Sequence, residues 1–136
     1  MAQSRVALVD SSAWIEFLRA TGSPADEWLT RLFKGGGAPA TTEPVQMELL
    51  AGAPQPTGRA RVRRILAACR MLSVNNASDW DRAADLYLAC RGAGATPRRM
   101  LDCLIAAVAI RVDLPVLAQD RDFELIAEHT QLQLAS

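Results

Sequence analysis

Apolar residues in this chain gather in short runs, and these runs alternate with longer stretches in which apolar residues recur at helical spacing. The short runs cover residues 5–9, 38–42, 71–74, 116–118 and 132–134, each with the length of a buried strand. The helical stretches cover residues 13–19, 25–34, 42–52, 59–70, 79–91, 98–112 and 123–129. We therefore predict a three-layer α/β/α fold, with a mainly parallel sheet of about four to five strands between helices.

Residues that favour helix starts precede several of these stretches. Asp10 and Ser12 follow the first strand and can cap the helix at 13–19. Pro44 falls in the first turn of the helix at 42–52, and Ser78 stands immediately before the helix at 79–91. These residues support the predicted order of strands and helices.

Length and composition indicate one folded domain over residues 1–136. Half of the residues are hydrophobic, and the formal net charge is zero, so no overall field draws the chain to nucleic acid or to a membrane. The three cysteines lie in apolar stretches without a C-x-x-C pair, which favours reduced, buried thiols. The longest apolar run is too short to span a membrane, and no signal peptide is recognisable. We expect a cytoplasmic protein without membrane attachment.

Four acidic residues interrupt the most apolar parts of the chain. They are Asp10, Glu48, Asp102 and Asp120, and Asp122 follows two residues after the last of them. In a parallel sheet the ligand site lies outside the carboxyl ends of the strands, where Asp10 and Asp120 fall. Clustered carboxylates without water need positive charge between them, and Mg²⁺ or Mn²⁺ is the economical source. The pattern therefore predicts a metal-dependent hydrolase.

Each of these acids could also have a purely structural role. Asp102 faces an apolar side of its helix and could simply pair with Arg98 or Arg99, one turn before it. Asp10, Asp120 or Asp122 could each cap a helix, and Glu48 could occupy a solvated position on the flank of its helix. Because all four acids of the set share the same apolar setting, one common site is the better interpretation.

Other chemistries have thin support. His129 is the single histidine, and a solvated or capping role is the simpler interpretation of it than Ser-His-Asp catalysis. The glycines at 35–37 lack the Gly-Lys-Ser/Thr of a phosphate-binding loop. Four arginines, at 59, 61, 63 and 64, could hold a phosphate backbone or form a solvated helix face, and the sequence does not favour either.

Four segments carry a resemblance to a known family. They are Val9-Asp10-Ser11-Ser12-Ala13-Trp14-Ile15, Thr42-Glu43-Pro44-Val45-Gln46-Met47-Glu48-Leu49-Leu50-Ala51-Gly52, Asp102-Cys103-Leu104-Ile105-Ala106-Ala107-Val108-Ala109 and Val116-Leu117-Ala118-Gln119-Asp120-Arg121-Asp122-Phe123. In this order and spacing they resemble the PIN-domain ribonucleases, and most closely the VapC toxins of bacterial type II toxin–antitoxin pairs. Together the segments span nearly the whole chain.

The resemblance implies roles for particular residues. The acidic quartet of the family corresponds to Asp10, Glu48, Asp102 and Asp120, which would bind metal and catalyse. Asp122 would be an accessory metal-binding acid, and the hydroxyl of Ser12 would help to hold the site. Whether Asp120 or Asp122 is the direct ligand stays open, as does the choice between one metal ion and two.

The expected reaction is hydrolysis of RNA phosphodiesters by water that Mg²⁺ activates, with Mn²⁺ able to substitute. Arg98 and Arg99 are placed to offset repulsion between the acids and the RNA backbone. A cognate VapB-type antitoxin would inhibit the enzyme by folding over its groove. A homodimer is also implied, and candidate interface residues that could equally be core residues are Trp28, Leu29, Leu32 and Phe33.

Two functions from other classes compete with this hypothesis. A phospho-receiver signalling domain also places acids at strand ends, but it needs adjacent acids after the first strand and a lysine near the last, whereas Ser11 follows Asp10 and the single lysine is Lys34. A PIN-like module that only binds its partner would not need the complete acidic quartet.

Overall fold

The computed structural model describes residues 6–136 and shows within them a four-stranded parallel sheet. The strands are β1 (Leu8–Val9), β2 (Ala40–Thr41), β3 (Arg70–Met71) and β4 (Val116–Leu117), in the spatial order β3-β2-β1-β4. In register, Leu8 pairs with Ala40 on one side and Val116 on the other. Each strand is shorter than its predicted run, and the first residue of the predicted strand 5–9 lies outside the described residues.

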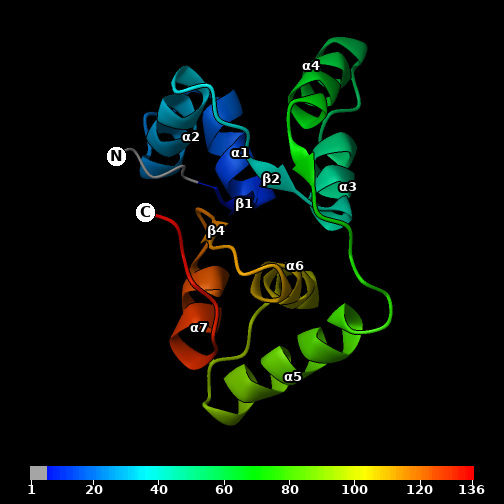
Figure 1. The fold of residues 1–136 in the computed structure, drawn as a ribbon, viewed down its shortest axis with the longest axis vertical. Helices are drawn as coiled ribbons and strands as arrows, with labels where there is room; N and C mark the ends of the chain where they lie inside the picture. The colour runs from blue at the N-terminus through cyan, green and yellow to red at the C-terminus, as the bar shows by residue number, and fades with distance from the viewer. Residues whose placement is uncertain (1–5) are drawn as a thin grey trace.

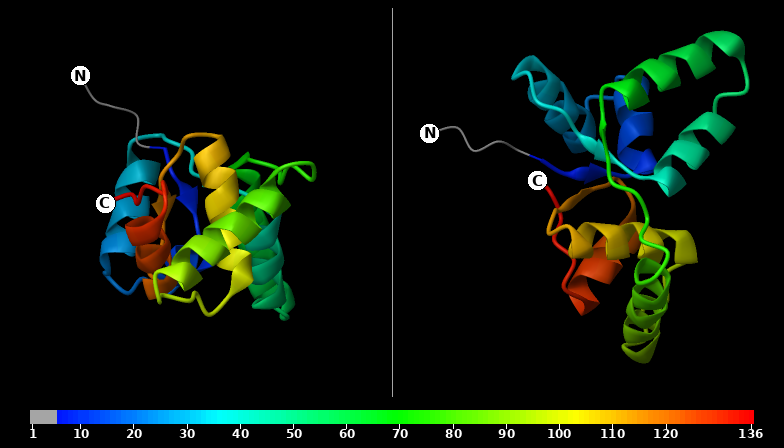
Figure 2. Two further views of the ribbon diagram at one scale, coloured as in Figure 1. Left: turned by 90° about the horizontal axis from the view of Figure 1, so that it is seen from below. Right: turned by 45° about the vertical axis from the view of Figure 1, so that its right-hand side comes forward.

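Helices cover both faces of this sheet (Figure 1). On one face lie α1 (Ser11–Leu18), α2 (Pro24–Lys34), α3 (Glu43–Ala51) and α4 (Pro56–Ala67). On the other lie α5 (Asp79–Gly92), α6 (Met100–Arg111) and α7 (Arg121–His129). The right-hand view of Figure 2 shows the same separation from another side. The predicted three-layer α/β/α architecture is confirmed.

Helix α6 lies at the centre of the core. Residues 102–109 are all buried, so the helix has no solvent-facing side over these turns. Its sequence is apolar all round, which is typical of a helix enclosed by other elements. Asp102 is the one carboxylate in this run and is only 1% exposed. The fold therefore places a charged group where water is excluded.

Several predicted helix boundaries were wrong, and for two of them the structure shows the cause. Helix α4 begins at Pro56, three residues before the predicted start, because proline suits the first helical position. Helix α6 begins at Met100 and not at Arg98, whose backbone amide instead donates to the Asp122 carboxylate. Ser78 does precede α5, but its side chain makes no capping hydrogen bond.

The predicted fifth strand at 132–134 is reduced to a single bridge. Leu134 pairs in parallel with Val116, at the outer edge of β4. The Val116 amide donates to the Gln133 carbonyl at 3.0 Å, and the Ala135 amide donates to the Val116 carbonyl at 2.9 Å. The C-terminal segment thus covers the edge of β4 without extending the sheet.

The candidate interface residues on α2 belong to the core. Trp28, Leu29 and Leu32 are buried, and Phe33 packs its ring against Phe17 at a centroid distance of 5.5 Å. Core packing therefore explains Trp28, Leu29 and Leu32, which are not free to form a dimer contact, whereas Phe33 is only partly buried. Among residues 6–136, no helix is long and apolar enough to cross a membrane.

A buried ion pair ties α5 to the end of α6. The Arg111 guanidinium donates to both oxygens of Asp79, at 3.0 and 3.1 Å, and to the Ser73 carbonyl at 2.8 Å. Asp79 is 1% exposed and also accepts from the Asn75 amide at 2.7 Å. Nothing in the sequence pattern indicated a partner for Asp79, so the pair was missed.

We expect Asp79→Ala to lower the free energy of unfolding by about 2 to 4 kcal/mol. The substitution leaves the Arg111 guanidinium half-buried without its partner and removes the acceptor of the Asn75 amide. Urea denaturation measures the loss, and Asp81→Ala, on the exposed side of the same helix turn, is the matched control. Equal stability of the two variants would show that the pair contributes nothing.

Candidate active site

Four chain segments bring acidic side chains to the carboxyl edge of the sheet. Asp10 directly follows β1, and Asp120 follows the neighbouring strand β4. Glu48 comes from α3, and Asp102 comes from the first turn of α6. Carboxyl ends of parallel strands meet at one edge, so the order of elements alone brings Asp10 and Asp120 close together.

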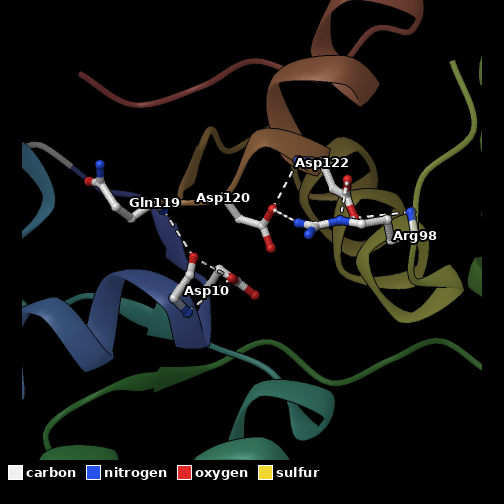
Figure 3. Close-up of polar contacts among 6 residues, drawn as sticks. Asp10, Arg98, Gln119, Asp120 and Asp122 are labelled. Carbon is white, nitrogen blue, oxygen red and sulfur yellow. Dashed lines mark hydrogen bonds and ion pairs between the residues drawn. The ribbon is translucent and has the colours of Figure 1, made fainter.

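Asp10 is held by the first turn of α1, which it caps. Its Oδ2 accepts from the Ser12 amide at 3.0 Å and from the Ser12 hydroxyl at 2.6 Å. The Ser12 Oγ in turn accepts from the Gln119 amide at 2.9 Å, so it joins the end of β1 to the loop after β4 (Figure 3). The other oxygen of Asp10, Oδ1, is buried and has no hydrogen-bond partner in the described part of the chain.

Asp102 has the least satisfied carboxylate of the group. Its Oδ2 is buried without a partner among residues 6–136. One oxygen each from Asp102, Asp120 and Asp122 all lie within 4.8 Å of one another. The expected alternative, an ion pair with Arg98 or Arg99, is absent at hydrogen-bonding distance, because both arginines bind other acids.

Arg98 binds the two acids that follow β4, as Figure 3 shows. Its Nε lies 3.3 Å from Asp122 Oδ1, and its terminal nitrogen donates to Asp120 Oδ1 at 3.0 Å. The Arg98 backbone amide also donates to Asp122 Oδ2, at 3.0 Å. Asp120 Oδ1 additionally caps α7 by accepting from the Asp122 amide at 3.0 Å. Both oxygens of Asp122 are therefore engaged, whereas Asp120 Oδ2 is not.

Glu48 is held between α1 and the start of α6. Its Oε1 accepts from the Ser11 hydroxyl at 3.3 Å, and its Oε2 accepts from the Arg99 guanidinium. Its side chain is 17% exposed, so it is not the solvated flank residue that its helix position alone allowed. Arg98 and Arg99 lie about one helical turn before Asp102 in sequence, and this proximity was the signal for their place at the site. Which acid each arginine binds required the structure.

Burial and mutual repulsion raise the pKa values of the acids at the centre of the site. Burial raises the pKa of Asp102 to about 7, and the carboxylate of Asp10 adds to the rise, while Arg99 opposes it. Burial also raises the pKa of Asp10, against the hydrogen bonds from Ser12, which favour the charged form. These raised pKa values indicate a site that lacks positive charge.

This arrangement suits a metal ion. Two buried carboxylate oxygens, one on Asp10 and one on Asp102, have no hydrogen-bond donor in the described chain, and such acceptors are costly unless a cation binds them. Five carboxylates face two arginines, so three negative charges stay unbalanced when all groups are ionised. Oxygen ligands of this kind are those that hard divalent cations prefer.

His129 lies elsewhere and lines a pocket of about 880 Å³ between α5 and α7, together with Asp81 and Asp85. Its Nε2 is 3.9 Å from Glu128 Oε2, at the end of α7. It is therefore not part of the acidic site, which agrees with the sequence interpretation.

Comparison with known proteins identifies the family. The PIN-domain family matches residues 7–129. Ribonuclease VapC11 of Mycobacterium tuberculosis and a VapC ribonuclease of Mycobacterium bovis are each 43% identical to this chain over 130 residues, which cover 95% of this chain and 97% of each relative.

Solved structures give the same result for the fold. The VapBC-5 toxin–antitoxin structure of Mycobacterium tuberculosis aligns over 95% of this chain and 96% of its own, with a TM-score of 0.66 and 26% identity. A chain of VapBC2 from Rickettsia felis aligns over 96% of this chain and 97% of its own, with a TM-score of 0.76 at 13% identity.

The chain belongs to the PIN-domain family, and within it to the VapC ribonucleases of toxin–antitoxin systems. The predicted resemblance is thus confirmed, and the phospho-receiver alternative was wrong. The two matches with VapC ribonucleases run nearly end to end, so they include all the segments on which the resemblance was based.

Proposed function

We propose that this protein is a Mg²⁺-dependent endoribonuclease toxin, active also with Mn²⁺, in which residues 1–136 form a single PIN domain. The observation that carries the proposal is the pair of buried, unpartnered carboxylate oxygens on Asp10 and Asp102, beside the acids that follow β4. The RNA substrate is inferred from the ribonuclease relatives, because the carboxylates alone suit DNA equally well.

The oxygens without a partner suggest which acids hold the metal ion. Asp10 Oδ1 and Asp102 Oδ2 are buried without a partner among the described residues, and the hydrogen bonds of Asp120 use only its Oδ1. We propose these three residues as the direct ligands, although the oxygens that lie within 4.8 Å of one another come from Asp102, Asp120 and Asp122. Asp122 engages both oxygens with Arg98, so we assign it the support of that arginine in place of direct ligation. Ser12 keeps Asp10 in place and joins it to the loop that carries Asp120.

A divalent ion at these ligands would lower the pKa of a water molecule and offset charge on the scissile phosphate. Side chains of the protein supply the other groups that the reaction needs. Glu48 completes the catalytic quartet, and its Oε2 becomes free to accept a proton when Arg99 turns towards the RNA. The side chains of Arg98 and Arg99, 74% and 45% exposed, can then contact phosphate oxygens.

The proposed partner is a VapB-type antitoxin. We expect the antitoxin to inhibit this ribonuclease in the cytoplasm. Relatives of known structure are toxin–antitoxin complexes, among them the VapBC-5 pair. Three unbalanced negative charges at the site favour a basic side chain of the antitoxin, which would neutralise the acids through charge-assisted hydrogen bonds. We also propose a homodimer; its contact surface must involve residues other than the buried ones on α2.

The products of cleavage test the mechanism. Hydrolysis by activated water should leave a 5′-phosphate and a 3′-hydroxyl and should need no 2′-OH. We expect EDTA to abolish cleavage, Mn²⁺ to restore it, and His129→Ala to cut at the wild-type rate, because His129 lines a separate pocket. Mass spectrometry of the RNA ends identifies the products. A 2′,3′-cyclic phosphate, or full activity in EDTA, would contradict the mechanism but not the family.

A further inference from the structure

We propose that Arg98 and Arg99 take the place of a second metal ion, so that each chain binds one divalent cation and a second ion has to displace Arg99. The inference rests on the proposed metal site and concerns how many ions that site accepts. It assigns the two arginines a role in the resting protein, before any RNA is bound.

The distribution of hydrogen bonds divides the five acids into two groups. Asp122 and Glu48 have every carboxylate oxygen engaged, the former by Arg98 and the latter by Ser11 and Arg99. The unengaged oxygens belong to the other three acids, Asp10, Asp102 and Asp120. Among the described residues, these three acids still have oxygens available for an ion, whereas Glu48 and Asp122 do not.

The position of Arg98 is fixed by the backbone and does not depend on its side chain alone. Its amide and its Nε both bind Asp122, and its terminal nitrogen binds Asp120. Arg99 follows in extended conformation at φ −129° and ψ 122°, immediately before α6. The same segment thus places both guanidinium groups at the acids.

Charge balance points the same way. Five carboxylates with two guanidinium groups and one divalent ion carry a net charge of minus one, close to neutrality. A second divalent ion would make the site positive while both arginines stay in place. Two divalent ions with only one guanidinium group would make the site neutral, so we expect a second ion to replace an arginine. Arg99, joined to Glu48 through one guanidinium nitrogen, has fewer attachments than Arg98.

The experiment is a Mn²⁺ titration of the purified chain without RNA, by calorimetry and by electron paramagnetic resonance of the free ion. We expect one bound Mn²⁺ per wild-type chain and two per chain of Arg99→Gln, because the substitution frees Glu48 Oε2 and removes the competing charge. Arg99→Lys keeps the charge and should bind one ion. Arg82→Gln, an exposed arginine of α5 outside the site, controls for the change in net charge and should also bind one.

The outcomes separate this inference from the proposed function. Two ions in the wild-type chain, or one ion in a folded Arg99→Gln chain, would overturn the role of the arginines and leave the metal site intact. An absence of Mn²⁺ binding in all four proteins would overturn the metal site itself, and the inference with it. Circular dichroism of each variant verifies that the fold is retained.

Discussion

Asp102→Asn should reduce RNA cleavage by about 10³-fold or more while making the metal-free protein more stable. The loss of activity follows because Asp102 is a proposed metal ligand, and residues of one catalytic unit fail together when one is removed. The gain in stability follows because the asparagine removes a buried charge beside Asp10 and can donate hydrogen bonds to the carboxylates around it.

The size of the stability gain comes from the shifted titration of Asp102. Its pKa rises from 3.8 to about 7, which corresponds to about 2 to 4 kcal/mol of destabilisation at neutral pH. Urea denaturation in EDTA measures this gain, and RNA cleavage with Mn²⁺ measures the loss of activity. Asp81→Asn, an exposed residue of α5, is the matched control and should change neither. Wild-type cleavage by a folded Asp102→Asn chain would contradict the site.

The stability of the metal-free protein should fall as pH rises from about 4 to about 7. In this window the folded chain keeps a proton on Asp102 that the unfolded chain has already released, so folding is favoured at low pH and the advantage is lost as the pH approaches the folded pKa. Above pH 7 both states are ionised and the contribution of Asp102 no longer changes. We expect a loss of about 2 to 4 kcal/mol across the window.

Denaturation curves at several pH values, in EDTA and in saturating Mg²⁺, measure this dependence. Asp102→Asn should lack the decline, and the difference between it and the wild-type chain isolates the Asp102 carboxyl from other titrating groups. Mg²⁺ binds the ionised acids, so it should stabilise the wild-type chain most at the higher pH. Parallel pH curves for the two proteins in EDTA would show that Asp102 titrates normally.

The sequence was sufficient to place the acids because parallel strands impose their own geometry. Asp10 and Asp120 end two apolar runs, and the carboxyl ends of neighbouring strands must share an edge. Asp102 was recognisable because an acid in a helix that is apolar all round has no water to face. The position of an acid at a strand end and its place within an apolar helix can both be read from the spacing of apolar residues along the chain.

Contacts between distant side chains were not predictable in the same way. The start of α6 depends on Asp122, which lies 24 residues after Arg98 and accepts its amide hydrogen bond. Asp79 and Arg111 are 32 residues apart, and nothing in the spacing of either residue indicates the other. Such pairs depend on how helices are rotated and translated against each other, which hydrophobic periodicity fixes only coarsely.

The proposed catalytic residues are spread over most of the chain, from Asp10 after β1 to Asp120 before α7. No smaller part contains them all, and Asp10 is linked through Ser12 to the amide of Gln119. A nascent chain on the ribosome therefore cannot assemble the site until the codons of residues 10–120 have all been read. For a ribonuclease made on an RNA template, this order of synthesis delays cleavage until the stretch of its own message that encodes these residues has been translated.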